Sequence, residues 1–169
     1  LEDYQDRIAL PRLQQLSSFR PQDQTRSLCG DLLVLEALKA YGNPCSLQYA
    51  KTELGKPYLP DIPDFHFNVS HSGSWVLCAT GCTPLGIDIQ QERPVKPAVL
   101  QRVLSEEEKR FFDSLRNLKR QSAFFDLWCL KEAYCKATGM GLHIPFRSFS
   151  LTLCPPTISD PAYQVMRIP

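Results

Sequence analysis

The sequence lacks the features that mark several large classes of protein. It has no apolar run near the roughly 20 residues that a membrane-spanning helix needs, so we expect no membrane partner. It has no excess of charge of one sign, because the formal net charge is only +1, so we expect no nucleic-acid partner either. It also has neither a Walker loop nor a G-x-G-x-x-G turn. Any site for an anion must therefore be local and of another type.

Paired metal-ligand cysteines are missing as well. The chain has seven cysteines, an odd number, and none of them forms a C-x-x-C pair. This spacing gives little support to a zinc site, a redox motif or a disulfide framework, which stay as alternatives. We predict buried, reduced thiols, and such thiols fit a cytoplasmic protein.

What the chain does contain is typical of a globular protein, with 43% apolar and 22% charged residues in 169. Apolar residues at helical spacing predict helices at 8–18, 23–41, 105–115 and 121–138. Alternating patterns predict strands at 46–52, 65–70, 75–80, 85–90, 148–153 and 162–168. This order predicts an α+β fold, and two similar α/β halves, residues 1–84 and 85–169, would explain it.

Charged residues on the 121–138 helix can be interpreted in two ways. Glu132 and Lys136 are four residues apart and so lie on one helix face. They form either a solvated ion pair or a carboxylate that holds a cation beside an ammonium group for phosphate.

Asp88, in the predicted 85–90 strand, either caps a turn or binds Mg²⁺, which takes one or two carboxylates together with water and substrate phosphates. His71 is either a turn histidine or, with Ser70, a donor to phosphate.

Three segments, taken together, resemble a known family. They are "GKPYLPDIPDFHFNVSHSGSWVLCA", "LGIDIQQERP" and "FFDLWCLKEAYCKATGMGL", in that order along the chain. Gly86-Ile87-Asp88 and Trp128-x-x-Lys131-Glu132-x-x-x-Lys136 are similar to the signature of the 4′-phosphopantetheinyl transferase superfamily, in its two-domain, Sfp-type branch. The resemblance runs from about Arg26 to Phe149.

The resemblance implies an activity. Members transfer the 4′-phosphopantetheine group of coenzyme A to a serine of an apo acyl or peptidyl carrier protein, with Mg²⁺, and release 3′,5′-ADP. Asp88 and Glu132 match the metal-binding acids, and Glu132 also matches the proposed general base. Lys136 matches the lysine on the pyrophosphate. The implied fold is pseudo-twofold, with the active site in the cleft between the two halves. Because one chain would supply both walls of that cleft, we expect a monomer. The implied protein is a cytoplasmic enzyme of the secondary-metabolite type.

The same resemblance also assigns ligand contacts to residues of the first half of the chain. Ser70, His71 and Lys56 match phosphate contacts, with His71 counted among the catalytic residues, and Arg26 matches the contact to the 3′-phosphate. We expect Ser70 and His71 to face Glu132 and Lys136 across the cleft.

Position 90 departs from the family pattern. Many members of the branch have a third acid there, whereas this chain has Gln90, whose neutral amide is a weaker metal ligand. Water or Glu92 would then complete the metal shell. This departure keeps an alternative open, namely a catalytically weakened relative that binds coenzyme A or a carrier protein.

Overall fold

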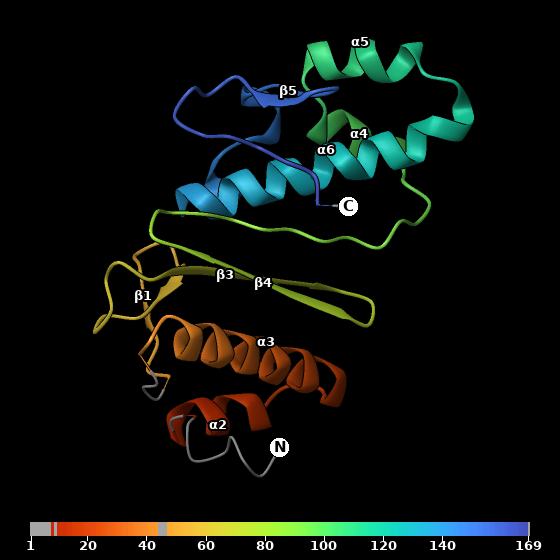
Figure 1. The fold of residues 1–169 in the computed structure, drawn as a ribbon. Helices are drawn as coiled ribbons and strands as arrows, with labels where there is room; N and C mark the ends of the chain where they lie inside the picture. The colour runs from red at the N-terminus through yellow and green to blue at the C-terminus, as the bar shows by residue number, and fades with distance from the viewer. Residues whose placement is uncertain (1–7, 9, 44–46, 169) are drawn as a thin grey trace.

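The N-terminal half of the protein is built from two helices stacked on a β-hairpin. In the computed structural model, which describes residues 8, 10–43 and 47–168, helix α2 (Leu10–Ser17) packs on α3 (Pro21–Ala40). Helix α3 in turn packs on the hairpin of β3 (His66–Ser72) and β4 (Trp75–Gly81) (Figure 1). The approach is close at Gly30, where an added Cβ would lie 2.9 Å from a methyl group of Val69. A short pair, β1 (Ala50–Lys51) and β2 (Pro57–Tyr58), lies near the end of the hairpin opposite its turn (Figure 1).

The C-terminal half surrounds one long helix, α6 (Asn117–Thr138). Helices α4 (Pro97–Val103) and α5 (Glu106–Ser114) lie on the side of α6 that faces away from the hairpin, together with β5 (Leu151–Leu153) and β6 (Pro156–Ile158) (Figure 1). Two 3₁₀ turns, η1 (Gly141–His143) and η2 (Phe146–Ser148), connect α6 to β5. Within the described residues the strands form three two-stranded antiparallel sheets. Helices and small sheets together confirm the predicted α+β class.

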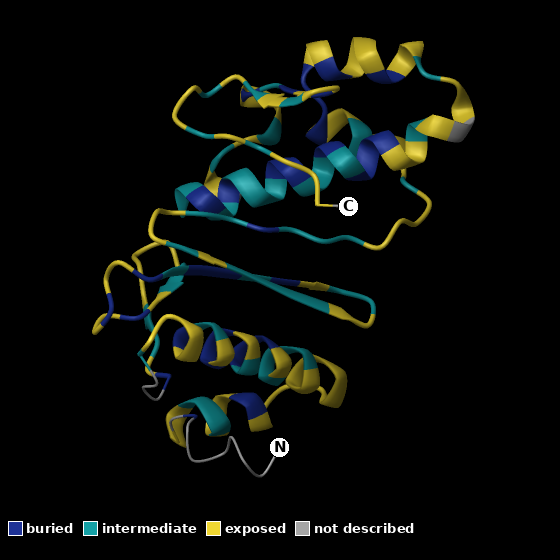
Figure 2. Cartoon of the chain, viewed as in Figure 1, coloured by how far each residue is buried: buried dark blue, intermediate teal, exposed yellow. Residues whose placement is uncertain are grey.

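Each half has its own hydrophobic core, and the buried faces of the helices turn toward these cores (Figure 2). Val34, Leu35 and Leu38 of α3 are fully buried in the first core. Phe124 and Leu127 of α6 are buried in the second core. The predicted helices therefore form because their apolar faces are buried.

The predicted helices are confirmed with shifted ends, and two of their end signals are seen. The Ser105 hydroxyl accepts from the Glu108 N–H while the Glu108 carboxylate accepts from the Ser105 N–H, which is the predicted capping box. Gly139 ends α6 in the left-handed region at φ 73°.

Several strand predictions are wrong or only partly right. Residues 85–90 and 162–168 alternate in sequence, but neither segment forms a strand. In the 46–52 segment only residues 50–51 are in a strand, and residue 46 lies outside the described residues. The 148–153 segment divides into a 3₁₀ turn and β5, while the hairpin strands are confirmed and end one or two residues later than predicted.

The predicted burial of the cysteines is also corrected. Six cysteines are described, and all six are free thiols, but Cys29, Cys82 and Cys154 are exposed and only Cys135 is buried. Cysteine in this chain is therefore not used mainly as a small core residue. Over the part of the chain that the structure describes, no helix combines the length and apolar character that crossing a membrane requires.

Candidate active site

The extended segment at residues 84–96 lies between the hairpin and α6 and joins the two halves (Figure 1). Its backbone is held by side chains: Asn68, Ser70 and Ser72 of β3 accept the N–H groups of Ile87, Ile89 and Gln91, at 2.8, 3.3 and 2.8 Å. Alternate residues of a strand share one face, so the segment runs across that face of the hairpin and not beside its edge. We call these three contacts the side-chain ladder. They explain why an alternating segment is not a strand.

Gly86 brings this segment against the backbone of α6. A Cβ added at Gly86 would lie 2.0 Å from the carbonyl oxygen of Ala133 and 2.6 Å from the amide nitrogen of Ala137. No side chain fits such a gap. The glycine before Ile87-Asp88 therefore lets the chain approach the helix closely, and it places Asp88 beside the helix face that carries Glu132 and Lys136.

Asp88 is the centre of the cluster, and its side chain is only 8% exposed. Its Oδ1 atom accepts from the Ser70 hydroxyl at 2.8 Å and from Lys136 Nζ at 2.6 Å. Its Oδ2 atom is buried and has no hydrogen-bond partner among the described residues. A buried, unpaired carboxylate oxygen is costly, so this atom is suited to a cation that the protein does not itself supply.

Lys136 uses all of its hydrogen-bonding capacity in this arrangement. Besides Asp88, its ammonium group donates to the Ser70 hydroxyl at 3.0 Å and to the carbonyl of Ile87 at 3.1 Å. An ammonium has three N–H donors, so none is left over for a phosphate. Lys136 would have to exchange at least one partner to bind a pyrophosphate.

Glu132 lies close enough to Asp88 for the two charges to interact. Burial first, and then the charge of Asp88, raise the pKa of Glu132, while Lys136 lowers it. No group among the described residues donates a hydrogen bond to its carboxylate. The Cys129 thiol also lies beside Asp88 without bonding to the free oxygen, and burial followed by that charge raises its pKa to about 12.

Two carboxylates that repel each other, one with an unpaired oxygen, fit a hard divalent cation such as Mg²⁺. The remaining ligands would come from water and from substrate phosphates, because no group of three or more His, Cys, Asp or Glu side chains in the described chain is arranged to hold a metal ion by itself.

The two other candidates for the metal shell lie in different surroundings. The Gln90 amide donates to the neighbouring carbonyl of Gln91 at 3.3 Å. Glu92 accepts from Gln121 at 3.4 Å, near the start of α6. Gln121 precedes Glu132 by eleven residues, roughly 16 Å along the helix axis. In this arrangement Glu92 is thus held away from Glu132.

His71 does not face Glu132 and Lys136, contrary to expectation. It follows Ser70 in β3, so it points to the opposite face of the hairpin, toward α3. There it lines a cavity of about 800 Å³ together with Arg26 and Lys51. Arg26 is also tied to the hairpin turn, because its guanidinium donates twice to the carbonyl of Gly73, at 3.0 and 2.7 Å.

Lys56 lies at the junction between the halves. Its ammonium donates to the carbonyls of Leu85 and Ala137, at 3.2 and 3.0 Å, and burial lowers its pKa. Two of its three donors are thus used, and one is available to a ligand. The cation also lies at the C-terminal end of α6, where a positive charge is favourable.

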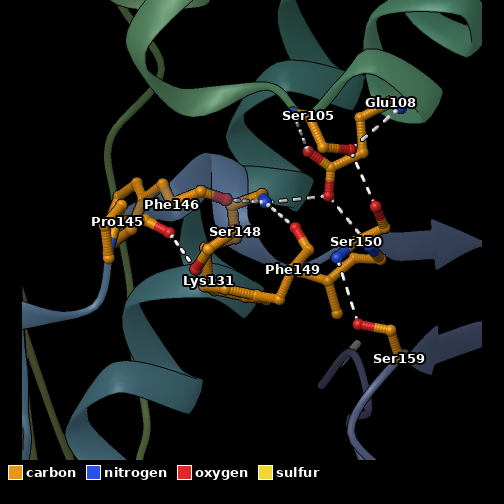
Figure 3. Close-up of polar contacts among 10 residues, drawn as sticks. Ser105, Glu108, Lys131, Pro145, Phe146, Ser148, Phe149, Ser150 and Ser159 are labelled. Atoms are coloured by element: carbon orange, nitrogen blue, oxygen red, sulfur yellow. Dashed lines mark hydrogen bonds and ion pairs between the residues drawn. The ribbon is translucent and has the colours of Figure 1, made fainter.

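Lys131, whose role the sequence leaves undefined, is fully buried inside the C-terminal half. It forms an ion pair with Glu108 at 3.0 Å and donates to the carbonyls of Phe146 and Phe149 (Figure 3). Glu108 also accepts from the backbone of Leu151 at 2.8 Å. The lysine therefore ties α6 to α5 and to the start of β5, and it does not reach the Asp88 cluster.

Comparisons with known proteins give one family for both halves of the chain. Residues 84–162 match the family model described as the 4′-phosphopantetheinyl transferase superfamily, and residues 10–83 match the one described as 4′-phosphopantetheinyl transferase, N-terminal. A 4′-phosphopantetheinyl transferase of Bacillus subtilis is 39% identical over 137 residues, which cover 80% of this chain and 61% of that protein.

Two further relatives agree. The 4′-phosphopantetheinyl transferase Sfp of Bacillus subtilis strain 168 is 38% identical over 139 residues, 80% of this chain and 61% of its own. The 4′-phosphopantetheinyl transferase psf-1 of Bacillus pumilus is 36% identical over 149 residues, 87% of this chain and 62% of its own. The chain thus spans less than two thirds of the length of these relatives.

Proposed function

Because the chain belongs to the 4′-phosphopantetheinyl transferase superfamily, in its Sfp-type branch, we propose that it transfers the 4′-phosphopantetheine group of coenzyme A to a serine of an apo carrier protein. The other product is 3′,5′-ADP. The observation that carries the proposal is the pair of neighbouring carboxylates, Asp88 and Glu132, with one buried oxygen of Asp88 left unpaired.

Asp88 and Glu132 are the groups that would hold Mg²⁺, with Gln90 as a weaker third candidate. When bound there, Mg²⁺ supplies positive charge that neutralises the pyrophosphate oxygens. The protein's own part is to position the reactants and to balance charge, since phosphoryl transfer needs little covalent help from the enzyme.

Glu132 is the group we assign as general base. Its raised pKa makes its carboxylate a stronger proton acceptor than an exposed glutamate, which suits the removal of a proton from a serine hydroxyl. Lys136 is the cation that we assign to the pyrophosphate, through exchange of one of its present partners.

We further propose that the cavity on the other face of the hairpin binds the nucleotide end of coenzyme A. Arg26 and His71 line this cavity and supply the donors that a phosphate group needs. Lys56, with one free donor at the junction, would contact the phosphates between the two sites.

The proposal includes the arrangement of the chain. Residues 1–84 and 85–169 act as two similar halves about a pseudo-twofold axis, with the active cleft between them and carrier docking on the second half. The two separate cores and the side-chain ladder support this division. One chain supplying both walls supports a monomer, and free thiols fit a cytoplasmic location.

The test is a transfer assay with the full chain, coenzyme A, Mg²⁺ and a panel of apo carrier proteins, read as the mass of the intact carrier. We expect addition of the phosphopantetheine mass to at least one carrier. Asp88→Asn should abolish it, whereas Asp113→Asn, which neutralises an exposed carboxylate of α5, should not. No transfer to any carrier under these conditions contradicts the proposed activity.

A second candidate function rests on Gln90, whose amide leaves the site with one carboxylate fewer than a three-acid shell. This candidate is a non-catalytic relative that binds coenzyme A or a carrier protein. Tight binding of coenzyme A by calorimetry, together with no mass added to any carrier, would favour it.

A further inference from the structure

Among the three side chains of the ladder, Ser70 is the one whose hydrogen bonds also reach Asp88 and Lys136. Ser70 is only 6% exposed, and its Oγ atom contacts Asp88, Lys136 and the backbone of Ile89. The contact to Asp88 Oδ1, at 2.8 Å, must use the hydroxyl proton, because an ionised carboxylate can only accept. The other two contacts, at 3.0 and 3.3 Å, come from N–H donors and use the two lone pairs of the oxygen.

The hydroxyl is therefore saturated, with one donated and two accepted hydrogen bonds. A hydroxyl in this state has no capacity left for a phosphate oxygen. The resemblance to the family assigns Ser70 to the phosphates, whereas its contacts here all go to the residues that surround the cation site.

The contacts also set the two oxygens of Asp88 apart. Both the hydroxyl of Ser70 and the ammonium of Lys136 bind Oδ1, and Oδ2 is left buried and unpaired. A carboxylate that could rotate freely would share these donors between its two oxygens. The Ser70 hydroxyl is itself held by the backbone of the extended segment, so it fixes which oxygen receives the lysine.

We propose that Ser70 is a positioning residue for the cation site: it directs Asp88 Oδ1 to Lys136 and so presents Oδ2 to a divalent cation. The proposal rests on the proposed function, because it assigns the cation of that same site. Groups that hold a metal-binding carboxylate by hydrogen bonds commonly contribute tenfold to a hundredfold to metal affinity.

The chain contains a matched control for this position. Ser72 is the next member of the ladder, and its hydroxyl accepts the backbone N–H of Gln91 at 2.8 Å. The replacement Ser72→Ala thus removes a ladder contact of the same type, but Ser72 has no contact with Asp88 or Lys136. A difference between the two alanine variants reports the contacts of Ser70 to the charged groups.

The experiment measures binding of Mn²⁺, a paramagnetic substitute for Mg²⁺, to the full chain without coenzyme A, by electron paramagnetic resonance. We expect Ser70→Ala to weaken Mn²⁺ binding by about tenfold to a hundredfold, and Ser72→Ala to change it by less than about twofold. Ser70→Thr, which keeps the hydroxyl, should recover most of the affinity. Thermal unfolding of each variant shows whether the fold is kept.

A second titration separates positioning from direct phosphate contact. In a metal-free buffer that contains a chelator, the affinity of the chain for 3′,5′-ADP should be unchanged by Ser70→Ala if Ser70 acts through Asp88. Loss of 3′,5′-ADP affinity with unchanged Mn²⁺ affinity would overturn the proposal and make Ser70 a phosphate contact. Equal Mn²⁺ losses in both alanine variants would overturn it too, because the ladder as a whole would then be responsible.

The proposed function can fail separately from this inference. A wild-type chain that transfers phosphopantetheine but binds Mn²⁺ no more tightly than Asp88→Asn overturns the role of Ser70 and leaves the activity standing. A chain that binds Mn²⁺ with the expected dependence on Ser70, yet transfers nothing, contradicts only the activity.

Discussion

Adding a single methyl group at Gly86 should separate the extended segment from α6. The new Cβ would lie 2.0 Å from the Ala133 carbonyl oxygen, whereas contacts of this kind are essentially never shorter than 3.0 Å. The segment would have to move by about 1 Å, because the obstacle is helix backbone that cannot rotate away. Overpacking of a close-packed interior costs about 1–3 kcal/mol, and a rigid obstacle places Gly86→Ala at or above the upper end.

For a chain of this size, about 3 kcal/mol corresponds to a fall of about 6–12 °C in melting temperature, measurable by circular dichroism. Gly81→Ala in β4 is the control, since its Cβ would meet the flexible tip of Leu85 at 3.0 Å and the Thr83 carbonyl oxygen at an ordinary 3.9 Å. We expect that control to change stability by less than about 1 kcal/mol. A Gly86→Ala protein that melts within about 1 °C of wild type would refute the reasoning, because the close approach would then be absent.

Three further predictions concern charged groups. Lys131→Met leaves Glu108 buried without its cation, and should lower the free energy of unfolding measured in urea by about 3–5 kcal/mol. An unchanged midpoint would mean that the pair is not buried. Since burial and Asp88 raise the pKa of Glu132, its ionisation costs stability as pH rises through that pKa. In a buffer that contains a metal chelator, Glu132→Gln should therefore have a higher melting temperature than wild type at pH 7. The difference in melting temperature should disappear as pH falls below the ordinary glutamate pKa, and a difference that is independent of pH contradicts this. Arg26→Ala should weaken coenzyme A binding by about 1.5–3 kcal/mol and leave 3′-dephospho-coenzyme A unaffected in calorimetry, whereas equal losses would assign Arg26 to the Gly73 contact alone.

The sequence predicted best the features whose cause is local. The capping box of Ser105 and Glu108 lies within one turn, and Gly139 ends α6 through its own backbone freedom. The apolar spacing of α3 and α6 reflects the cores that they cover. These signals depend on neighbours a few residues away, so one sequence is enough to find them.

The errors arise where alternation has two possible causes. Residues 85–90 alternate because one side packs on the hairpin and the other on α6, not because the segment pairs edge to edge with a strand. The pattern alone cannot distinguish these arrangements. Ser70 and His71 are neighbours in β3, so strand alternation places their side chains on opposite faces. The family match assigned both residues to phosphate contacts, and this led to the wrong expectation that both face Glu132 and Lys136.

The candidate site was predictable in part. Spacing places Glu132 and Lys136 on one helix face, and the family signature adds Asp88. The burial of Lys131 was not predictable, because its partner Glu108 lies in a different helix and nothing in the neighbouring sequence separates this lysine from an exposed one. The same holds for Lys56, whose acceptors are backbone carbonyls of the other half.

The side-chain ladder also affects how this protein can change during evolution. In an ordinary sheet both partners of each hydrogen bond belong to the backbone, so an exchange of side chains leaves the bonding pattern in place. Here the acceptors are the side chains of Asn68, Ser70 and Ser72, and each contact can be removed by one codon change without altering the strand. The strength of the connection between the halves is thus a heritable quantity that selection can adjust one contact at a time.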